Sequence, residues 1–445
     1  MVTEIATSTN SFQDAFRALQ QNQTEAAQLW LNRLRESAMA RFDELGFPTT
    51  HDEEWKYTNV APLAKIGFTP IASATAATAN DLESVGIPET RNSQLVFVNC
   101  QVRTDLSSLT DLPATVVVRE LSEALADERY IEVIRENLAR NADFVANSFT
   151  ALNTALINTG AFVLIPKGVK IEAPLHLLFI SLAATPKAAT FPRVLLVAEE
   201  NSSATLVESY VSPRDSQHFT NAVVEVVLKE GARLEHYKVQ RESNQAFHIA
   251  TTAADLGANS SYDATTVTFG AQLSRHDVHV NMDHEGAECW VDGLYLVTGS
   301  QHTDTHSVID HRKPHCTSHQ LYKGILDGKS RAVFNGKVFV RHDAQKTDAM
   351  QTNKNLLLSN EARVDTKPQL EILADDVKCA HGAAVGQIEE DELFYLEARG
   401  IHPDLARNLL TYGFAEEVIG KIKIESIRTQ LDEAVLNRLN ARLEV

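Results

Sequence analysis

The stretch NAVVEVVLKEGARLEHYKVQ, residues 221–240, sets the pattern for the middle of this chain. A run rich in valine ends at a polar turn, Gly231–Ala232, and a second strand-like run follows at once. Similar runs alternate with polar turns from about Phe149 to Gln387, and no helical period appears among them. We therefore predict a mainly β region over residues 149–387.

The turns recur at an interval of their own. They contain Asn201, Gly231, Gly257, Gly286, Gly328 and Asn360. Their successive spacings are 30, 26, 29, 42 and 32 residues, and a strand-like run follows each turn. Such a period is typical of a β-solenoid, because each coil buries its inner face only against neighbouring coils. A β-sandwich gives similar strands, but it gives no reason for a turn that returns at this interval.

Helical patterns flank the β region on both sides. Amphipathic runs occupy much of residues 10–46, and further runs follow Gln387, the first of which ends at Arg399–Gly400. The chain thus divides into an N-terminal helical and mixed region (1–148), the β region (149–387) and a C-terminal helical domain (388–445). We expect the last helices either to cap the open edge of the solenoid or to present a groove or ridge to a partner.

Composition and charge exclude several classes of protein. The net charge of −18 argues against nucleic acid as a partner, since its backbone requires clustered Lys and Arg. The four cysteines form no CxxC pair, which argues against a disulfide framework and a closed zinc site. The chain shows no secretory signal and no apolar run long enough to span a membrane. These features predict a cytoplasmic protein with reduced cysteines and no membrane partner.

The most informative polar cluster is Cys379–Ala380–His381–Gly382. Cys379 and His381 are two residues apart, so their side chains share one face of an extended strand. Thiolate and imidazole both bind soft or borderline transition metals. Two ligands cannot complete a tetrahedral site, so further ligands would come from other coils or from another chain. The alternative is that Cys379 is simply a buried structural cysteine.

Three other features carry less weight. Eight histidines lie between His276 and His319, where we expect hydrogen-bonded surface or turn residues and assign no role. The segment Gly324–Ser330 resembles a phosphate-binding loop, but it is one residue short and a strand-like run follows it, so we predict no nucleotide site. Trp55 and Tyr57 are either a packing anchor or a partner-facing site.

A family resemblance covers essentially the whole chain. The run from Val333 to Ile388, which includes QTNKNLLLSNEARVDTKPQLEI and KCAHGAAVGQ, resembles the SufD branch of the SufB/SufD family, part of the SUF iron–sulfur cluster assembly system. LFYLEARGI (393–401), IPKGVKIEAPL (165–175) and EEWKYT (53–58) are also similar to that family. EEWKYT, and glycine rather than glutamate at Gly382, favour the SufD branch over the SufB paralogue, which remains the alternative within the family.

The resemblance implies a right-handed parallel β-helix between helical ends, acting as a non-catalytic scaffold. Its β-helix would pair with SufB, and its C-terminal domain would dock the ATPase SufC. The implied candidates for the SufB interface are Asp365, Lys367, Gln369, Glu371, Cys379 and His381. The implied candidates for SufC docking are Phe394, Tyr395, Arg399, Gly400, Leu409, Leu410 and Phe414.

The resemblance also implies what the site would hold. His381, with Cys379 beside it, would bind iron or a nascent iron–sulfur cluster that is transient and shared with SufB. Reduced flavin in the assembled complex and a homodimer of the isolated chain are open expectations, and no cofactor is expected to bind the isolated chain tightly. The alternative from a different class is a cytoplasmic β-helix enzyme acting on carbohydrate, with a groove of acids along one face and activity without partners.

Overall fold

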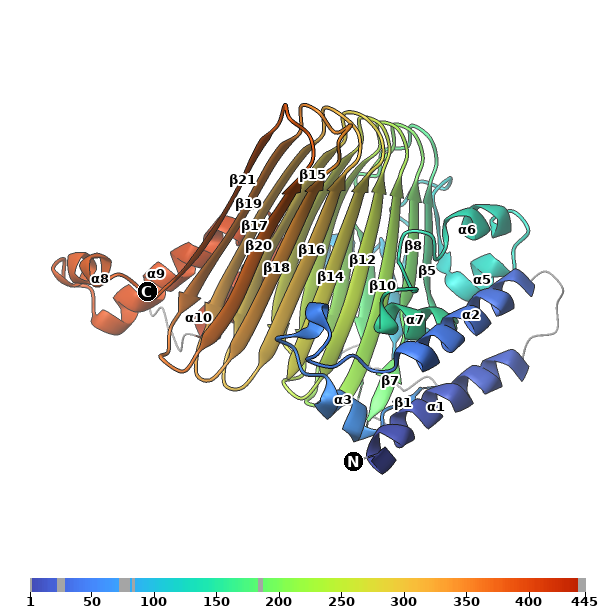
Figure 1. Ribbon diagram of the computed structural model, residues 1–445, viewed down its shortest axis with the longest axis horizontal. Coiled ribbons are helices and arrows are strands. Elements are labelled where there is room, and N and C mark those ends of the chain that lie inside the picture. The colour runs from blue at the N-terminus through green and yellow to red at the C-terminus, as the bar shows by residue number, and fades with distance from the viewer. Residues whose placement is uncertain (1, 22–28, 72–80, 82–84, 183–186, 439–445) are drawn as a thin grey trace.

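The computed structural model describes residues 2–21, 29–71, 81, 85–182 and 187–438. Its core is a parallel β-helix in which the chain passes alternately through two facing sheets (Figure 1). Each coil contributes one strand to each sheet, so neighbours within a sheet are every second strand of the chain. The mainly β solenoid with helices toward both chain ends, predicted from the sequence, is confirmed.

The two sheets contain the following strands. Sheet A runs in the order β4 (Val117–Glu120), β5 (Gly160–Ile165), β8 (Arg193–Ala198), β10 (His218–Leu228), β12 (Phe247–Leu256), β14 (Leu273–Met282), β16 (His302–His311), β18 (Arg331–Val340) and β20 (Arg363–Ile372). The short strand β7 (Ala188–Thr190) pairs with β10, and β1 (Thr69–Pro70) pairs with β7. Sheet B runs in the order β3 (Gln101–Val102), β2 (Gln94–Val98), β6 (Leu175–Ile180), β9 (Ser203–Val211), β11 (Arg233–Glu242), β13 (Ser261–Gly270), β15 (Glu288–Val297), β17 (Thr317–Leu326), β19 (Asp348–Leu357) and β21 (Lys378–Gly386).

One corner of the coil repeats with high regularity. It holds residues whose backbone is left-handed, with φ between 54° and 72°: Asn201, Gly231, Asn259, Gly286, His315 and Lys346. Each of these amides donates to a carbonyl of the following coil, as Gly231 does to Ala258. Glycine and asparagine adopt this conformation most readily, which is why they mark the first four corners in the sequence. The stacked corners fix the pitch of the coil.

The predicted spacing of 42 residues has a structural explanation. Gly286 lies at the corner that leads into sheet B, whereas Gly328 lies at the corner that leads into sheet A. The first series continues through His315 and Lys346, which have positive φ without being glycine. Paired residues therefore stay 26 to 32 positions apart from β8 onward, as in Phe247 opposite Leu273 and Arg331 opposite Arg363.

The first coil is closed at its outer edge. β4 pairs antiparallel with β5, and β3 pairs antiparallel with β2, so the parallel ladder ends there. The helices of the N-terminal part are α1 (Val2–Gln21), α2 (Leu29–Leu45), α3 (Ala61–Ile66), α5 (Leu121–Leu125), α6 (Ile131–Asn137) and α7 (Ser148–Ala155). Phe12, Phe42 and Phe149 from these helices pack with Phe219 and Phe247 on the outer face of sheet A. No helix among the described residues is long and apolar enough to cross a membrane.

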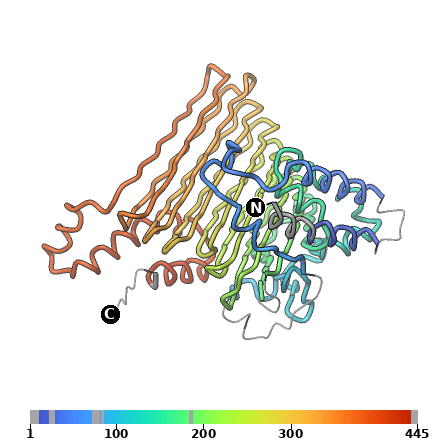
Figure 2. The backbone as a smooth tube through the Cα atoms, turned by 60° about the horizontal axis from the view of Figure 1, so that its bottom comes forward, coloured from blue at the N-terminus to red at the C-terminus, as the bar shows by residue number. Residues whose placement is uncertain are grey.

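The C-terminal helices α8 (Glu390–Glu397), α9 (Pro403–Ile419) and α10 (Glu425–Arg438) lie beside the solenoid. Ile419, Ile422 and Ile427 pack with Tyr237 and Leu294 on the outer face of sheet B. Of the two expectations for these helices, capping is wrong, because their apolar side chains pack on the outer face of sheet B and β20 and β21 keep an unpaired edge. Figures 1 and 2 show that no other element in the described part of the chain covers the last coil, which forms one end of the solenoid.

Candidate functional site

The open end of the solenoid is formed by β20 and β21. Within the described chain each of these strands pairs on one side only, and nearly every residue of β21 is exposed. An unpaired edge of this kind leaves backbone N–H and C=O groups free to pair with another strand. The predicted metal ligands, Cys379 and His381, lie on this edge strand.

Cys379 and His381 point toward the interior of the solenoid. Their neighbours in register on the adjacent strand β19 are Ala349 for Cys379 and Gln351 for His381. Ala349 and Gln351 are each 1% exposed, whereas Met350 between them is 43% exposed, so the odd-numbered side chains face inward. Residues in register point to the same side of a sheet, which places Cys379 and His381 at the mouth of the interior.

The two side chains differ in exposure. Cys379 packs against the apolar cluster that contains Val338 and Ala349 and is partly buried, whereas His381 is exposed. Burial raises the pKa of the Cys379 thiol, and the backbone N–H of Ala349 partly offsets this effect. The thiol of the free chain therefore keeps its proton near neutral pH, and a metal would have to displace that proton.

The open end of the solenoid does not hold a complete metal site by itself. Nowhere in the described ranges do three or more His, Cys, Asp or Glu side chains come close enough together to hold a metal ion. Cys379 and His381 supply two of the donors that a tetrahedral site needs.

The other predicted interface residues lie on the outer face of sheet A, whereas Cys379 and His381 face the interior from sheet B. Asp365, Lys367, Gln369 and Glu371 alternate along β20 and point outward from sheet A. Lys367 donates to Glu53 at 2.8 Å, and Asp365 pairs with Arg331 at 3.2 Å. All of them border the open end, but they do not come together with Cys379 and His381.

The predicted docking residues of the C-terminal domain fall into two groups. Phe394, Tyr395 and Leu409 are exposed, and the guanidinium of Arg399 lies 4.4 Å from the centre of the Tyr395 ring. Gly400 has a φ of +86° where the chain leaves α8. The second group, Leu410 and Phe414, lines a shallow groove of about 270 Å³ beside Leu356 and Gly386.

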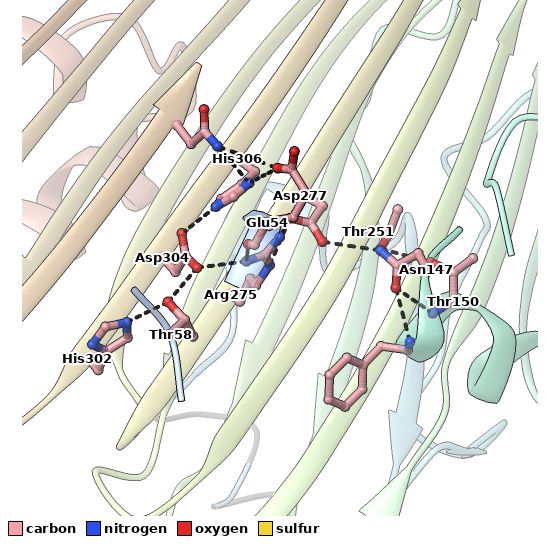
Figure 3. Close-up of polar contacts among 12 residues, drawn as sticks. Glu54, Thr58, Asn147, Thr150, Thr251, Arg275, Asp277, His302, Asp304 and His306 are labelled. Carbon is pink, nitrogen blue, oxygen red and sulfur yellow. Dashed lines mark hydrogen bonds and ion pairs between the residues drawn. The ribbon is translucent and has the colours of Figure 1, made fainter. Parts of the chain in front are cut away.

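A segment of the N-terminal region, EEWKYT (53–58), crosses the outer face of sheet A (Figure 3). Its Trp55 is buried, with the guanidinium of Arg275 3.8 Å from the ring centre and Phe149 on another side. The packing-anchor interpretation is therefore right for Trp55, while Tyr57 is 37% exposed. We call this segment the strap.

Polar contacts hold the strap against β14 and β16. The Thr58 hydroxyl donates to Asp304 at 2.6 Å and so must accept the Nε2 proton of His302 at 2.8 Å. His306 lies between Glu54 at 3.2 Å and Asp304 at 3.1 Å. Figure 3 shows these side chains converging between the strap and the sheet.

The strap contacts create an ion network. Burial opposes a proton on His306, but Asp304 and Glu54 more than offset it and raise the pKa of His306 to about 9. The hydrogen bond from His306 lowers the pKa of Glu54 to about 2. At neutral pH, His306 is therefore a cation held between two carboxylates.

The expectation of surface or turn histidines is wrong for His276, His306 and His311, which are buried on strands. Within the histidine-rich stretch, His276, His302, His306 and His311 contact Thr252, the strap and Ser318. A signal was present, because His302, Asp304 and His306 alternate and must share one face of a strand. What that face meets could not be known from the local pattern.

Comparison with known families covers nearly the whole chain. The domain described as "SUF system FeS cluster assembly, SufBD core domain" matches residues 180–414, and the "SufBD protein N-terminal region" matches residues 6–177. The core domain therefore spans most of the solenoid, the open end and the start of the C-terminal helices.

Individual relatives match over similar lengths. An iron–sulfur cluster assembly SufBD family protein of Synechocystis is 37% identical, covering 90% of this chain and 89% of its own length. Iron–sulfur cluster assembly protein SufD of Escherichia coli is 32% identical, covering 89% and 90%. Protein ABCI7, chloroplastic, of Arabidopsis thaliana is 33% identical, covering 91% and 85%. This solenoid with its open, Cys- and His-bearing end therefore belongs to the SufBD family of the SUF iron–sulfur cluster assembly system.

Proposed function

We propose that this chain is a scaffold subunit of an iron–sulfur cluster assembly complex, and that it pairs through its open end with a SufB-like chain. The observation that carries the proposal is the unpaired edge of β20 and β21, which exposes backbone groups beside Cys379 and His381. Proteins normally cover or block such an edge, so an uncovered one suits a partner strand.

The cluster, or iron on its way to a cluster, is the cargo of this interface. Cys379 and His381 provide a thiolate and an imidazole, which suit iron and its clusters. The partner chain supplies the remaining donors, and the cluster leaves the complex afterwards. The chain itself catalyses no reaction and works in the cytoplasm, and reduced flavin belongs to the assembled complex if it is bound at all.

The C-terminal domain docks a SufC-like ATPase. Phe394 and Tyr395 are 71% and 56% exposed on α8, and together with Leu409 they expose apolar surface on a small helical unit. Exposed apolar patches of this kind mark protein interaction sites. Movement of the ATPase would reach the open end through α9, which contacts β15 and β17.

The carbohydrate-enzyme alternative is not favoured. A groove of about 780 Å³ on sheet B does contain Glu235, Asp263 and Asp292. Lys421 and Lys423, from the segment that joins α9 to α10, form ion pairs with Asp292 and Glu235. Acids paired in this way are poorly suited to act as a free acid and base pair.

Co-expression with SufB-like and SufC-like chains, followed by anaerobic cluster reconstitution, tests the proposal. We expect all three chains to purify together and to assemble a cluster with its visible absorption. His381→Ala should abolish that absorption, while His342→Ala, at an exposed histidine near the same end, should not. Cluster assembly that survives His381→Ala, or failure of the chains to associate, would overturn the proposal.

A further inference from the structure

The interior of the solenoid is apolar in its first coils, buries charged side chains such as Glu208, Lys238 and Glu242 in its middle coils, and holds amide side chains in its last coils. In the first coils the inward side chains are apolar, as Val163, Leu177 and Leu196 illustrate. In the last coils the buried inward residues include Gln320, Gln351, Asn353 and Asn355. Asn355 and the half-buried Thr366 both donate to the side-chain carbonyl of Asn353, at 2.6 and 2.9 Å. A polar lining therefore lies directly behind His381, whereas Cys379 has Ala349 behind it.

Two amide side chains of this lining are stacked in register. The Oε1 of Gln320 accepts the Ser307 hydroxyl at 2.8 Å and the Nε2 of Gln351 at 3.4 Å. The Nε2 end of Gln351 is thereby directed to the coil behind it. Its Oε1 is buried and has no hydrogen-bond partner among the described residues.

The next residue in this row is His381. Gln320 pairs in register with Gln351, and Gln351 pairs in register with His381. Gly336 on the facing sheet leaves room for the amide, because a Cβ there would lie 2.3 Å from the Nε2 of Gln351. A buried carbonyl without a donor is unfavourable, and the coil ahead of it carries an imidazole with a ring N–H to donate.

We propose that Gln351 is a positioning residue for His381, whose ring N–H its side-chain carbonyl accepts. This hydrogen bond fixes which ring nitrogen carries the proton and turns the other nitrogen toward the open end. Histidine ligands commonly donate their second ring N–H to such a carbonyl or carboxylate. The inference rests on the proposed function only for what the free nitrogen then binds; the hydrogen bond itself, which the structure does not contain, would involve only residues of this chain.

The full chain labelled with ¹⁵N-histidine tests the hydrogen bond by NMR, with the His381 signal assigned from its loss in His381→Ala. Wild type should show one neutral tautomer of His381. Gln351→Met, which keeps the size but removes the acceptor, should give a mixture of tautomers. Gln351→Glu restores an acceptor oxygen and should restore the single tautomer. Gln240→Met, at another buried inward glutamine, should leave the spectrum of His381 unchanged. An unchanged tautomer in Gln351→Met, or a mixture in Gln351→Glu, would refute the positioning role.

A second measurement separates this inference from the proposed function. In the complex with the SufB-like chain, Gln351→Met should weaken Fe(II) binding about 10- to 100-fold, and Gln351→Glu should recover most of that loss. If His381→Ala leaves cluster assembly intact, the proposed function fails whatever the tautomer result. If His381→Ala abolishes assembly while Gln351→Met changes neither tautomer nor affinity, only the positioning role fails.

Discussion

One imidazole, His306, joins the strap to sheet A. Its two nitrogens meet carboxylates from different parts of the chain, Glu54 in the strap and Asp304 on its own strand. Arg275 adds a second cation, which contacts Asp304 at 2.9 Å and donates to the backbone carbonyl of Glu54 at 2.6 Å. Removing one member of a buried network leaves its partners unpaired, so single substitutions here should lower the stability of the fold substantially.

We expect His306→Gln to destabilise the protein in a pH-dependent way. An unfolded histidine titrates near 6.5, whereas folded His306 keeps its proton up to a pKa of about 9. Its charge therefore stabilises the fold fully below pH 6.5, and that contribution is lost as the pH rises through 9. The variant should lose about 1–3 kcal/mol at pH 6 and less at pH 9.5, which melting curves at the two values would measure.

The control for this experiment is His342→Gln, because His342 is an exposed turn residue. It should change the melting temperature little at either pH. An equal loss for His306→Gln at both pH values would mean that the charge on the ring does not stabilise the strap.

At the scale of one strand, pairing along the free edge of β21 can be tested without changing Cys379 or His381. Lys378 donates its N–H to Thr347 of the neighbouring coil, so the alternate residues, including Ala383, present their N–H groups to the open side. Ala383→Pro removes one such donor and leaves the pairing with β19 intact. We expect it to weaken binding of the SufB-like chain while the melting temperature stays near that of wild type.

Ala383→Ser is the matched variant, since it keeps the N–H group. Isothermal titration with the partner chain would compare the two variants. Equal affinities for Ala383→Pro and Ala383→Ser would show that the partner does not pair along this edge.

The α8 helix carries a prediction of its own. Deleting the chain from Leu393 onward would remove the docking surface but also uncover the apolar face of sheet B, so point variants are sharper. Phe394→Ala combined with Tyr395→Ala should weaken binding of the SufC-like ATPase by at least about tenfold. Val145→Ala, at an exposed apolar residue of the N-terminal part, should not. Unchanged ATPase binding in the double variant would move the docking site elsewhere.

The elements differ in how far the sequence could predict them. The coils and the shared face of Cys379 and His381 follow from local periods, and local periods are visible in the sequence. Alternation defines two faces but does not say which one is interior, so the inward direction needed the structure. The contact between Thr58 and His302 joins residues 244 positions apart, and no local pattern carries it.

The C-terminal helices show the same limit at a larger scale. The sequence placed apolar stripes on these helices, and the structure buries Val418 of those stripes but leaves Phe394 and Leu409 exposed. The stripes did not say whether the edge or the side of the solenoid would provide the surface. The choice depends on how much apolar area each offers, which only the folded sheets reveal.

For the whole molecule, we expect the free chain to self-associate weakly through its open end. Two such ends can pair edge to edge, but each chain has a net charge of −18, so like-charge repulsion opposes the contact. Added salt screens that repulsion and should strengthen the dimer. Analytical ultracentrifugation at several salt and protein concentrations would measure it, with Ala383→Pro expected to shift the equilibrium toward monomer. A chain that is monomeric under all these conditions would contradict the expectation.

The antiparallel strands β3 and β4 at the first coil have a consequence for stoichiometry. A solenoid whose two ends were both free could stack end to end without limit and form fibres. Here β4 and β3 turn the ladder antiparallel at one end, so a further parallel coil cannot be added there, and the end with β20 and β21 is the one that keeps its unpaired edge. Two such chains joined there leave no growing end, and the assembly stops at a pair.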